Sequence, residues 1–157
     1  MMYDIPPDIH TVICNNCVYI TNSEEVNPLN NPVYNVKVIV DYKVYDFYSL
    51  SGRKDTQDLD RNISGIEAPS PNGTYTIGTL TEGYTYETGG VFLPYEPNFE
   101  TERSNLGWHW DPSWGLDNGE DGTEGCHAFE SEEIFNNFYS LIKDNNINNL
   151  IIEYNVI

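Results

Sequence analysis

The chain has 157 residues, of which 39% are hydrophobic and 13% aromatic, as expected for one globular domain with a sizeable core rather than for a disordered chain. It carries 25 Asp and Glu against 7 Lys and Arg, which gives a formal charge of −18 at pH 7. Such a surface repels phosphate backbones and anionic headgroups, so we expect no nucleic acid partner. The first residues lack a basic start and an apolar run, and no segment reaches membrane-spanning length, so we expect neither a secretory signal peptide nor membrane insertion.

The first 32 residues are expected to form an irregular lead-in that carries one strand. Residues 10–20 are rich in Val, Ile and Cys and are predicted to be this strand. Residues 22–32 are rich in Asn, Pro and Glu and are predicted to be a loop.

Two of the three cysteines lie in this lead-in, in the motif Cys14-Asn15-Asn16-Cys17. Three cysteines allow at most one disulfide within the chain and leave one thiol free. Together with His10, the motif offers three ligands to zinc, one short of a closed tetrahedral site, and it is also compatible with a redox dithiol. We favour two ordinary, half-buried strand cysteines over both alternatives.

Residues 33–157 are predicted to form the main domain, which is built mostly of β-strands. The alternation of Val36, Val38 and Val40 is typical of a strand with one buried face. By this and similar patterns we expect strands at residues 33–39, 44–50, 74–78, 81–88, 90–93, 106–110 and 150–154. Turns or loops are expected between them, with a tight connection at 41–43, a charged surface loop at 53–61, a Pro- and Gly-containing turn at 68–73 and a glycine-rich loop at 111–125.

One helix is predicted after this last loop. Ser131 is a favourable N-cap, and Glu132 and Glu133 complement the positive end of the helix dipole. An apolar stripe follows at helical spacing, formed by Ile134, Phe138, Leu141 and Ile142. We expect the helix to end near Asn145, ahead of the final strand.

The chemistry-bearing part of the chain is the pair His109 and Cys126. Residues 107–111 have the sequence Gly-Trp-His-Trp-Asp, and residues 121–126 have the sequence Asp-Gly-Thr-Glu-Gly-Cys. A histidine and a cysteine are the minimum for thiol catalysis, because the imidazole takes the thiol proton and the thiolate attacks an acyl carbon. The alternative is a core histidine and an inert buried thiol. A calcium loop at residues 117–122 lacks the oxygen ligands that it would need, and His109, Cys126 and His127 lack a fourth zinc ligand.

Three segments together resemble one known family. Residues 68–77 (Ala-Pro-Ser-Pro-Asn-Gly-Thr-Tyr-Thr-Ile) are similar to its proline-glycine turn and following strand. Residues 103–109 (Arg-Ser-Asn-Leu-Gly-Trp-His) resemble the segment that carries its histidine. Residues 122–126, which we call the nucleophile loop, resemble the Ser/Thr-His-Gly-Cys end of its signature. The family is that of the YkuD-type L,D-transpeptidases of peptidoglycan. The resemblance covers residues 33–157 and implies a mostly β fold, a YkuD-like β-sandwich or open barrel with one helix packed after the nucleophile loop.

The resemblance also implies roles for the central residues. Cys126 would be the nucleophile and His109 its general base, oriented through the backbone carbonyl of Trp110. Thr123 and Gly125 would shape the nucleophile loop, and the N–H groups of Gly125 and Cys126 are candidate donors to an oxyanion. No cofactor and no metal are implied.

Three further residues are candidates for substrate binding. Arg103 lies where members of the family often keep a basic residue, which could pair with a substrate carboxylate. Trp108 and Trp110 could wall a substrate cleft, although packing beneath the glycine-rich loop would suit them equally well.

One residue departs from the family pattern. Glu124 stands where the family has the histidine before Gly-Cys, and a carboxylate near the thiol would raise the pKa of Cys126 above its usual value. His127 follows the cysteine directly, but adjacent residues of a strand point to opposite faces, so we do not expect it to substitute.

The predicted function is therefore cysteine-dependent acyl transfer on peptidoglycan stem peptides, by an L,D-transpeptidase or an L,D-carboxypeptidase. Without a signal peptide, the protein would reach the wall with a bacteriophage particle, during lysis or through a secretion system, and would otherwise be cytoplasmic. The first route implies assembly into a larger particle. The alternatives are a non-catalytic virion or surface-binding protein that keeps the fold with a degraded site, and a small metal-binding module built on His10, Cys14 and Cys17.

Overall fold

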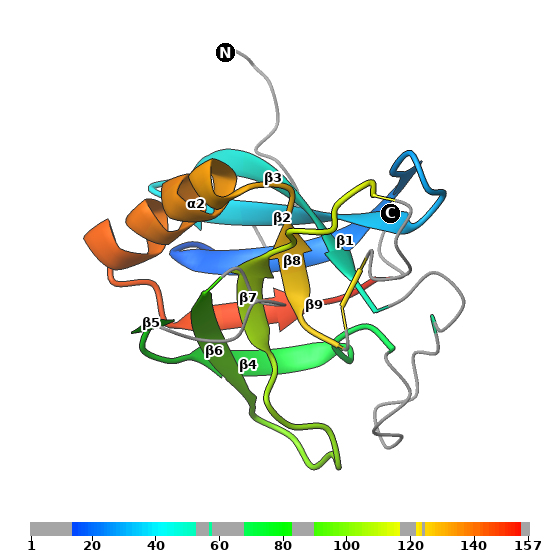
Figure 1. Ribbon diagram of the computed structural model, residues 1–157. Coiled ribbons are helices and arrows are strands. Elements are labelled where there is room, and N and C mark those ends of the chain that lie inside the picture. The colour runs from blue at the N-terminus through cyan, green and yellow to red at the C-terminus, as the bar shows by residue number, and fades with distance from the viewer. Residues whose placement is uncertain are drawn as a thin grey trace.

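The computed structural model describes residues 14–52, 57, 68–82, 90–116, 122–123 and 125–154. The elements within these ranges are β1 (Cys17–Val26), β2 (Pro32–Val40), β3 (Lys43–Ser51), β4 (Gly73–Ile77), β5 (Thr81–Glu82), β6 (Val91–Pro97), β7 (Gly107–Trp110), β8 (His127–Phe129), α2 (Glu132–Asp144) and β9 (Asn149–Ile152). They form a mostly β protein with a helix near the C-terminal end (Figure 1).

Eight of these strands form a closed, mixed barrel. Around the barrel the order is β4-β9-β1-β2-β3-β8-β7-β6, and pairing of β4 with β6 closes the ring, while β5 pairs with β6 alone. Within the described ranges β1 is parallel to β9 and β7 is parallel to β8, and the other neighbours are antiparallel. We expected a sandwich or an open barrel. Because β4 pairs with β9 on one side and β6 on the other, the ring has no open edge.

Most of the predicted strands are confirmed. β2, β3, β4, β7 and β9 begin and end within about two residues of the predicted bounds. β6 continues through Pro97, beyond its predicted end at residue 93. Residues 10–13 and 83–88 of predicted strands, and the predicted loop at 53–61 apart from residue 57, lie outside the described residues.

Two strands differ from the prediction, and their pairing explains why. β1 continues through residues 22–26, which we expected to be a loop, because a bulge between Asn22 and Glu25 lets this polar segment keep pairing with β2. It lies between β9 and β2, so the strand that we placed in a lead-in is part of the barrel. β8 was not predicted at all, since three residues are too few to show alternation, and it is held by β3 and β7.

Cys14 and Cys17 form a disulfide, which corrects our expectation of two separate strand cysteines. Their Cα atoms are 6.1 Å apart, within the range that a disulfide bridges, and Asn16 between them has a φ of 59°. Cys126 is the cysteine outside this bond. His10 lies outside the described residues, and within these no group of three or more potential metal ligands occurs.

Helix α2 begins at the predicted N-cap. The Ser131 hydroxyl oxygen accepts a hydrogen bond from the Ile134 N–H at 3.3 Å, and Asn145 is the C-cap. The buried positions of the helix are Phe135, Phe138 and Ile142, so the face that meets the barrel includes Phe135, which the predicted stripe omitted. Across the described ranges no helix combines the length and apolar character needed to cross a membrane.

The barrel interior changes character from one end to the other. Toward α2 it is apolar, and the Phe138 ring contacts the rings of Phe47, Trp108 and Phe129 at centroid distances of 5.6, 4.9 and 4.8 Å. Away from the helix, buried hydroxyls and an imidazole replace the apolar rings. The polar side chains there are Ser49, Ser51, Ser70, Tyr95, His127 and Tyr154.

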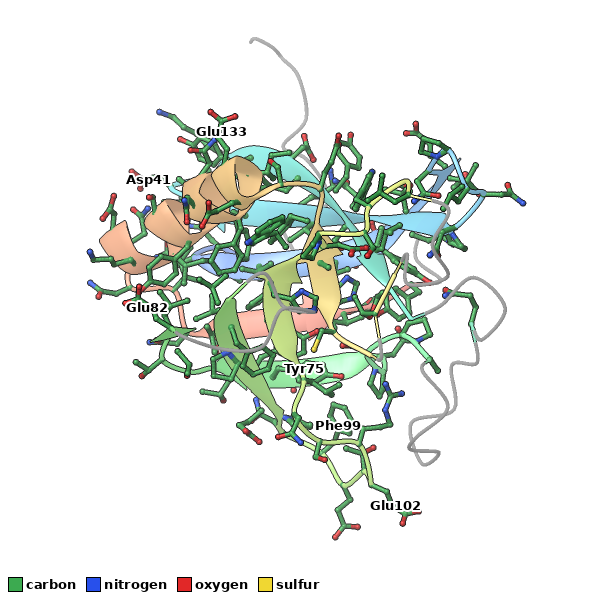
Figure 2. All side chains as sticks on the ribbon, in the orientation of Figure 1. Asp41, Tyr75, Glu82, Phe99, Glu102 and Glu133 are labelled. Atoms are coloured by element: carbon green, nitrogen blue, oxygen red, sulfur yellow. A yellow bond between two sulfur atoms is a disulfide. The ribbon has the colours of Figure 1, made fainter. Side chains whose placement is uncertain are left out.

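The acidic charge is spread around the outside of the barrel. In the view of Figure 2, Asp41 in the β2–β3 turn and Glu133 on α2 lie near one another, whereas Glu82 on β5 and Glu102 in the β6–β7 connection lie well away from them and from each other. This distribution favours a solvated surface over a single acidic site.

Candidate active site

His109 is held on β7 in one orientation. Its side chain is only 5% exposed, and Nδ1 lies 2.8 Å from the backbone carbonyl oxygen of Trp110. A carbonyl can only accept a hydrogen bond, so Nδ1 carries the proton and Nε2 keeps the lone pair of the neutral ring. The expected orientation of His109 through the Trp110 carbonyl is confirmed. It leaves Nε2 as the nitrogen that can take up a proton.

The parallel pairing of β7 with β8 brings Cys126 to the same part of the sheet as His109. Trp108 pairs with His127 and His109 with Ala128, so continuing the register by one residue places Cys126 beside Gly107. Neighbouring strands are roughly 4.8 Å apart and a strand rises roughly 3.3 Å per residue, so the Cα atoms of Cys126 and His109 are roughly 8 Å apart. The two side chains can span that distance.

The thiol of Cys126 lies near the start of β7. Sγ is 3.5 Å from the carbonyl oxygen of Asn105, to which the thiol donates, and the residue is half-buried. The thiol also acts electrostatically on the hydroxyl of Tyr95, whose pKa is raised mainly by burial and further by Cys126. The nucleophile candidate is therefore partly accessible to solvent.

Thr123 organises the loop in front of the cysteine. Its hydroxyl oxygen accepts hydrogen bonds from the N–H groups of Gly52 and Gly125, at 2.8 and 3.1 Å, and donates to the Cys126 carbonyl at 2.6 Å. The Thr123 N–H in turn donates to the Gly52 carbonyl at 3.0 Å. Because the Gly125 N–H is bonded to Thr123, it is not available to an oxyanion, which corrects one of the two predicted donors.

Arg103 packs directly against Gly125. Its guanidinium donates from Nη1 to the Pro69 carbonyl at 3.0 Å and from Nη2 to the Ala68 carbonyl at 2.8 Å. Gly125 has a φ of 138°, and a Cβ there would overlap Nη2 of Arg103. The arginine, 7% exposed, thus ties the Pro-containing turn to the nucleophile loop, instead of pointing outward to a substrate carboxylate.

The two tryptophans of β7 differ in their surroundings. Trp108 is fully buried, with its ring 4.7 Å from that of Tyr95, so it does not wall a substrate cleft and belongs to the core. Its Nε1 has no hydrogen-bond partner in the described part of the chain. Trp110 is partly buried against the same core, and its carbonyl oxygen is the acceptor for His109.

A cluster of buried hydroxyls that no sequence pattern predicted lies under the nucleophile loop. We call Ser51, Ser70, Tyr95 and Tyr154 the hydroxyl cluster. Ser70 is its centre: the N–H donates to Ser51 Oγ at 3.1 Å, and the carbonyl accepts from the Tyr154 hydroxyl at 2.5 Å. The Ser70 side chain lies 2.5 Å from the Tyr95 hydroxyl and donates to the carbonyl of Gly125. Only the position of Ser70 in the Pro-Ser-Pro turn could have drawn attention to it.

His127 is buried beside this cluster and is neutral. Burial lowers its pKa to about 3, with a further contribution from the nearby His109. The Tyr154 hydroxyl donates its one hydrogen bond to the backbone carbonyl of Ser70. Nε2 of His127, 2.9 Å from the Tyr154 oxygen, must therefore be the donor to Tyr154. Nδ1 then accepts from Ser49 Oγ at 2.7 Å. With both ring nitrogens engaged inside the barrel, His127 does not replace His109, as predicted.

Asp111 anchors the start of the loop that leads to the cysteine. Its two carboxylate oxygens accept from the N–H groups of Ser113 and Gly122 at 2.8 and 3.0 Å. Glu124 and residues 117–121, on which we based the thiol pKa argument and the calcium alternative, lie outside the described residues.

Neither a scan against protein-family models nor a search of curated proteins finds a match to this chain.

Proposed function

We propose that the protein is a cysteine-dependent acyl transferase or hydrolase, an L,D-transpeptidase or L,D-carboxypeptidase that acts on peptidoglycan stem peptides. The single observation that carries the proposal is the hydrogen bond from His109 Nδ1 to the Trp110 carbonyl, at 2.8 Å. This bond leaves the lone pair on Nε2, and a general base needs such a nitrogen, because only a nitrogen with a lone pair accepts the thiol proton.

The surroundings of the pair support the same chemistry. Continuing the register of β7 and β8 by one residue brings the Cα atoms of Cys126 and His109 to roughly 8 Å, which supports the pairing. The Thr123 hydroxyl makes three hydrogen bonds that hold the backbone next to Cys126. A glycine at 125 lets Arg103 approach the loop closely. The combination of a closed β-rich domain, a glycine before the cysteine and a helix soon after it favours a YkuD-like fold.

The reaction would proceed by two acyl transfers. His109 Nε2 takes the thiol proton, and the thiolate of Cys126 forms a C–S bond with the carbonyl carbon between the L- and D-centres of a stem peptide. The carbonyl electron pair moves to oxygen and returns as the C–N bond breaks, while the imidazolium gives its proton to the departing amine of the D-residue. An amine of a second stem, or water, then attacks the thioester and restores the thiol.

The enzyme needs only side chains and backbone groups for this sequence, so we propose no cofactor. The partner is the stem peptide. Delivery with a bacteriophage particle, by lysis or by a secretion system remains our proposal for how the protein meets the wall.

The test is covalent labelling of the intact protein followed by mass spectrometry. Incubation with a carbapenem, which acylates enzymes of the family that the sequence resembles, is expected to add one mass increment on Cys126. A His109→Ala variant is expected to lose this increment, and a Cys126→Ala variant locates it. Incubation with muropeptides is expected to release the terminal D-residue.

Two results would contradict the proposal. One is equal labelling of His109→Ala and wild type, which would make the histidine a bystander. The other is a thiol that stays unmodified by every acyl donor while the protein is folded, which would favour the non-catalytic virion or surface-binding alternative.

A further inference from the structure

We infer that Ser70, with Tyr95 behind it, is a positioning residue that aims the backbone N–H of Cys126 at the oxygen of the acyl group during thiol acylation. The inference rests on the proposed function only in so far as Cys126 is acylated, and not on the identity of the substrate. No motif of the sequence marks Ser70 for such a role.

The Gly125 carbonyl is held by buried hydroxyls. Its oxygen accepts from the Ser70 hydroxyl and, at 3.4 Å, from the Ser51 hydroxyl. Both serines are fully buried in the polar end of the barrel interior. The carbonyl of Gly125 therefore points into the barrel.

Peptide geometry sets the direction of the Cys126 N–H relative to this carbonyl. The bond between Gly125 and Cys126 is trans, so its C=O and N–H vectors point in opposite directions. A carbonyl held toward the buried hydroxyls turns the Cys126 N–H away from them. In acyl transfer by a thiol, the N–H of the nucleophile itself is well placed to donate to the developing oxyanion.

The hydrogen bonds from Tyr95 to Ser70 and from Ser70 to Gly125 run in one direction. A serine hydroxyl has one proton, and Ser70 gives it to the Gly125 carbonyl. The Tyr95 hydroxyl, 2.5 Å from Ser70 Oγ, must then be the donor to it. A chain of two donors polarises the peptide group at its end, which makes the Cys126 N–H a stronger donor. Tyr95 is fully buried and its pKa is raised, so the phenol keeps the proton that this chain requires.

Further contacts hold the backbone of Gly125 and Ser70 in place. The Gly125 N–H is bonded to Thr123, and Arg103 occupies the space where a side chain at position 125 would lie. The Ser70 carbonyl accepts from Tyr154 and the Ser70 N–H donates to Ser51, so the serine cannot rotate away without breaking buried hydrogen bonds. The peptide plane is thus held from both sides before substrate arrives.

The experiment compares two reactions of the same thiol in the full-length protein. Acylation by p-nitrophenyl acetate develops an oxyanion and breaks the C–O bond to nitrophenolate, whereas alkylation by iodoacetamide displaces iodide without an oxyanion. Both rates are measured over a range of pH, with the adduct on Cys126 followed by mass spectrometry. The variants are Ser70→Ala and Tyr95→Phe, and the matched control is Ser49→Ala, a fully buried serine that bonds to His127 and not to Gly125.

We expect Ser70→Ala to slow acylation by about 10-fold or more, since removing an oxyanion donor outright costs about 100-fold to 1000-fold. Alkylation and its pH profile should stay within about 2-fold of wild type, because the thiol and His109 are untouched. Tyr95→Phe should slow acylation less, and Ser49→Ala should change neither rate.

Equal losses in acylation and alkylation for Ser70→Ala would overturn the inference, because they would report a general disturbance of the site. An unchanged acylation rate in a folded Ser70→Ala variant would overturn it as well. If wild type is acylated by the ester with the expected Ser70 dependence but leaves stem peptides intact, the substrate of the proposed function is wrong and the role of Ser70 stands. A wild-type thiol that reacts with iodoacetamide but not with the ester contradicts both proposals.

Discussion

Replacing His127 with glutamine tests how strongly the barrel interior holds this imidazole in its neutral form. The ring is fully buried and accepts from Ser49 and donates to Tyr154, and burial lowers its pKa from 6.5 to about 3. A glutamine amide also offers an acceptor, its carbonyl oxygen, and a donor, its NH2 group, so the substitution removes the titration while keeping the two kinds of hydrogen bond.

The sign and size of the effect follow from proton linkage. Below about pH 6.5 the unfolded chain binds a proton at this histidine and the folded chain does not until about pH 3, so the free energy of unfolding falls as pH falls through this window. The slope approaches about 1.4 kcal/mol per pH unit, which amounts to roughly 2–3 kcal/mol between about pH 7 and about pH 4.5. Above about pH 6.5 the contribution no longer changes.

Urea unfolding of wild type and of the His127→Gln variant at these two pH values measures the effect. The carboxylates titrate in both proteins, so the quantity of interest is the additional loss in wild type, expected to be roughly 2–3 kcal/mol. A variant whose stability falls between the two pH values by as much as that of wild type would refute the reasoning, since it would mean that His127 can charge inside the barrel.

Two further changes test contacts around the site and at the helix. Gly125→Ala introduces a Cβ into the space of the Arg103 guanidinium at a backbone conformation that favours glycine, so we expect loss of carbapenem acylation together with a lower midpoint of thermal unfolding, and an unaffected variant would argue against the close packing of the two residues. Ser131→Ala removes the N-cap of α2 and should lower the free energy of unfolding by about 1 kcal/mol in urea, while the acylation rate stays as in wild type; a variant as stable as wild type would show that the cap bond to Ile134 contributes little.

The parts of the fold that the sequence predicted are those with a strong local signal. The alternating valines of β2 mark a strand with one buried face, and Ser131 with two following glutamates marks a helix start, so both were found within about two residues. β8 has no such signal, because three residues are too few to show a period, and only its two neighbours in the barrel make it a strand. The polar end of β1 was missed because a bulge, not a hydrophobic pattern, keeps it paired.

The candidate site divides in the same way. The pairing of His109 with the Trp110 carbonyl joins adjacent residues, so a motif can imply it. The partners of Arg103 are carbonyls more than thirty positions away in the chain, and the partner of Ser70 is 55 positions away. No local pattern distinguishes a serine or an arginine that will meet a distant backbone group from one that faces solvent, so these roles emerge only from the folded barrel.

The gap between the histidine and the cysteine has a structural cause in this barrel. β7 and β8 are parallel neighbours, and a parallel pair requires a crossover connection of about a dozen residues or more to return the chain to the start of the sheet. The nucleophile loop is the end of that crossover: Asp111 anchors its beginning, Thr123 and Gly125 shape its return, and Cys126 is the last residue before β8. The crossover therefore delivers the thiol to the end of the barrel where β7 begins, beside the buried hydroxyls, while His109 lies farther along β7 with its basic nitrogen fixed by the next carbonyl.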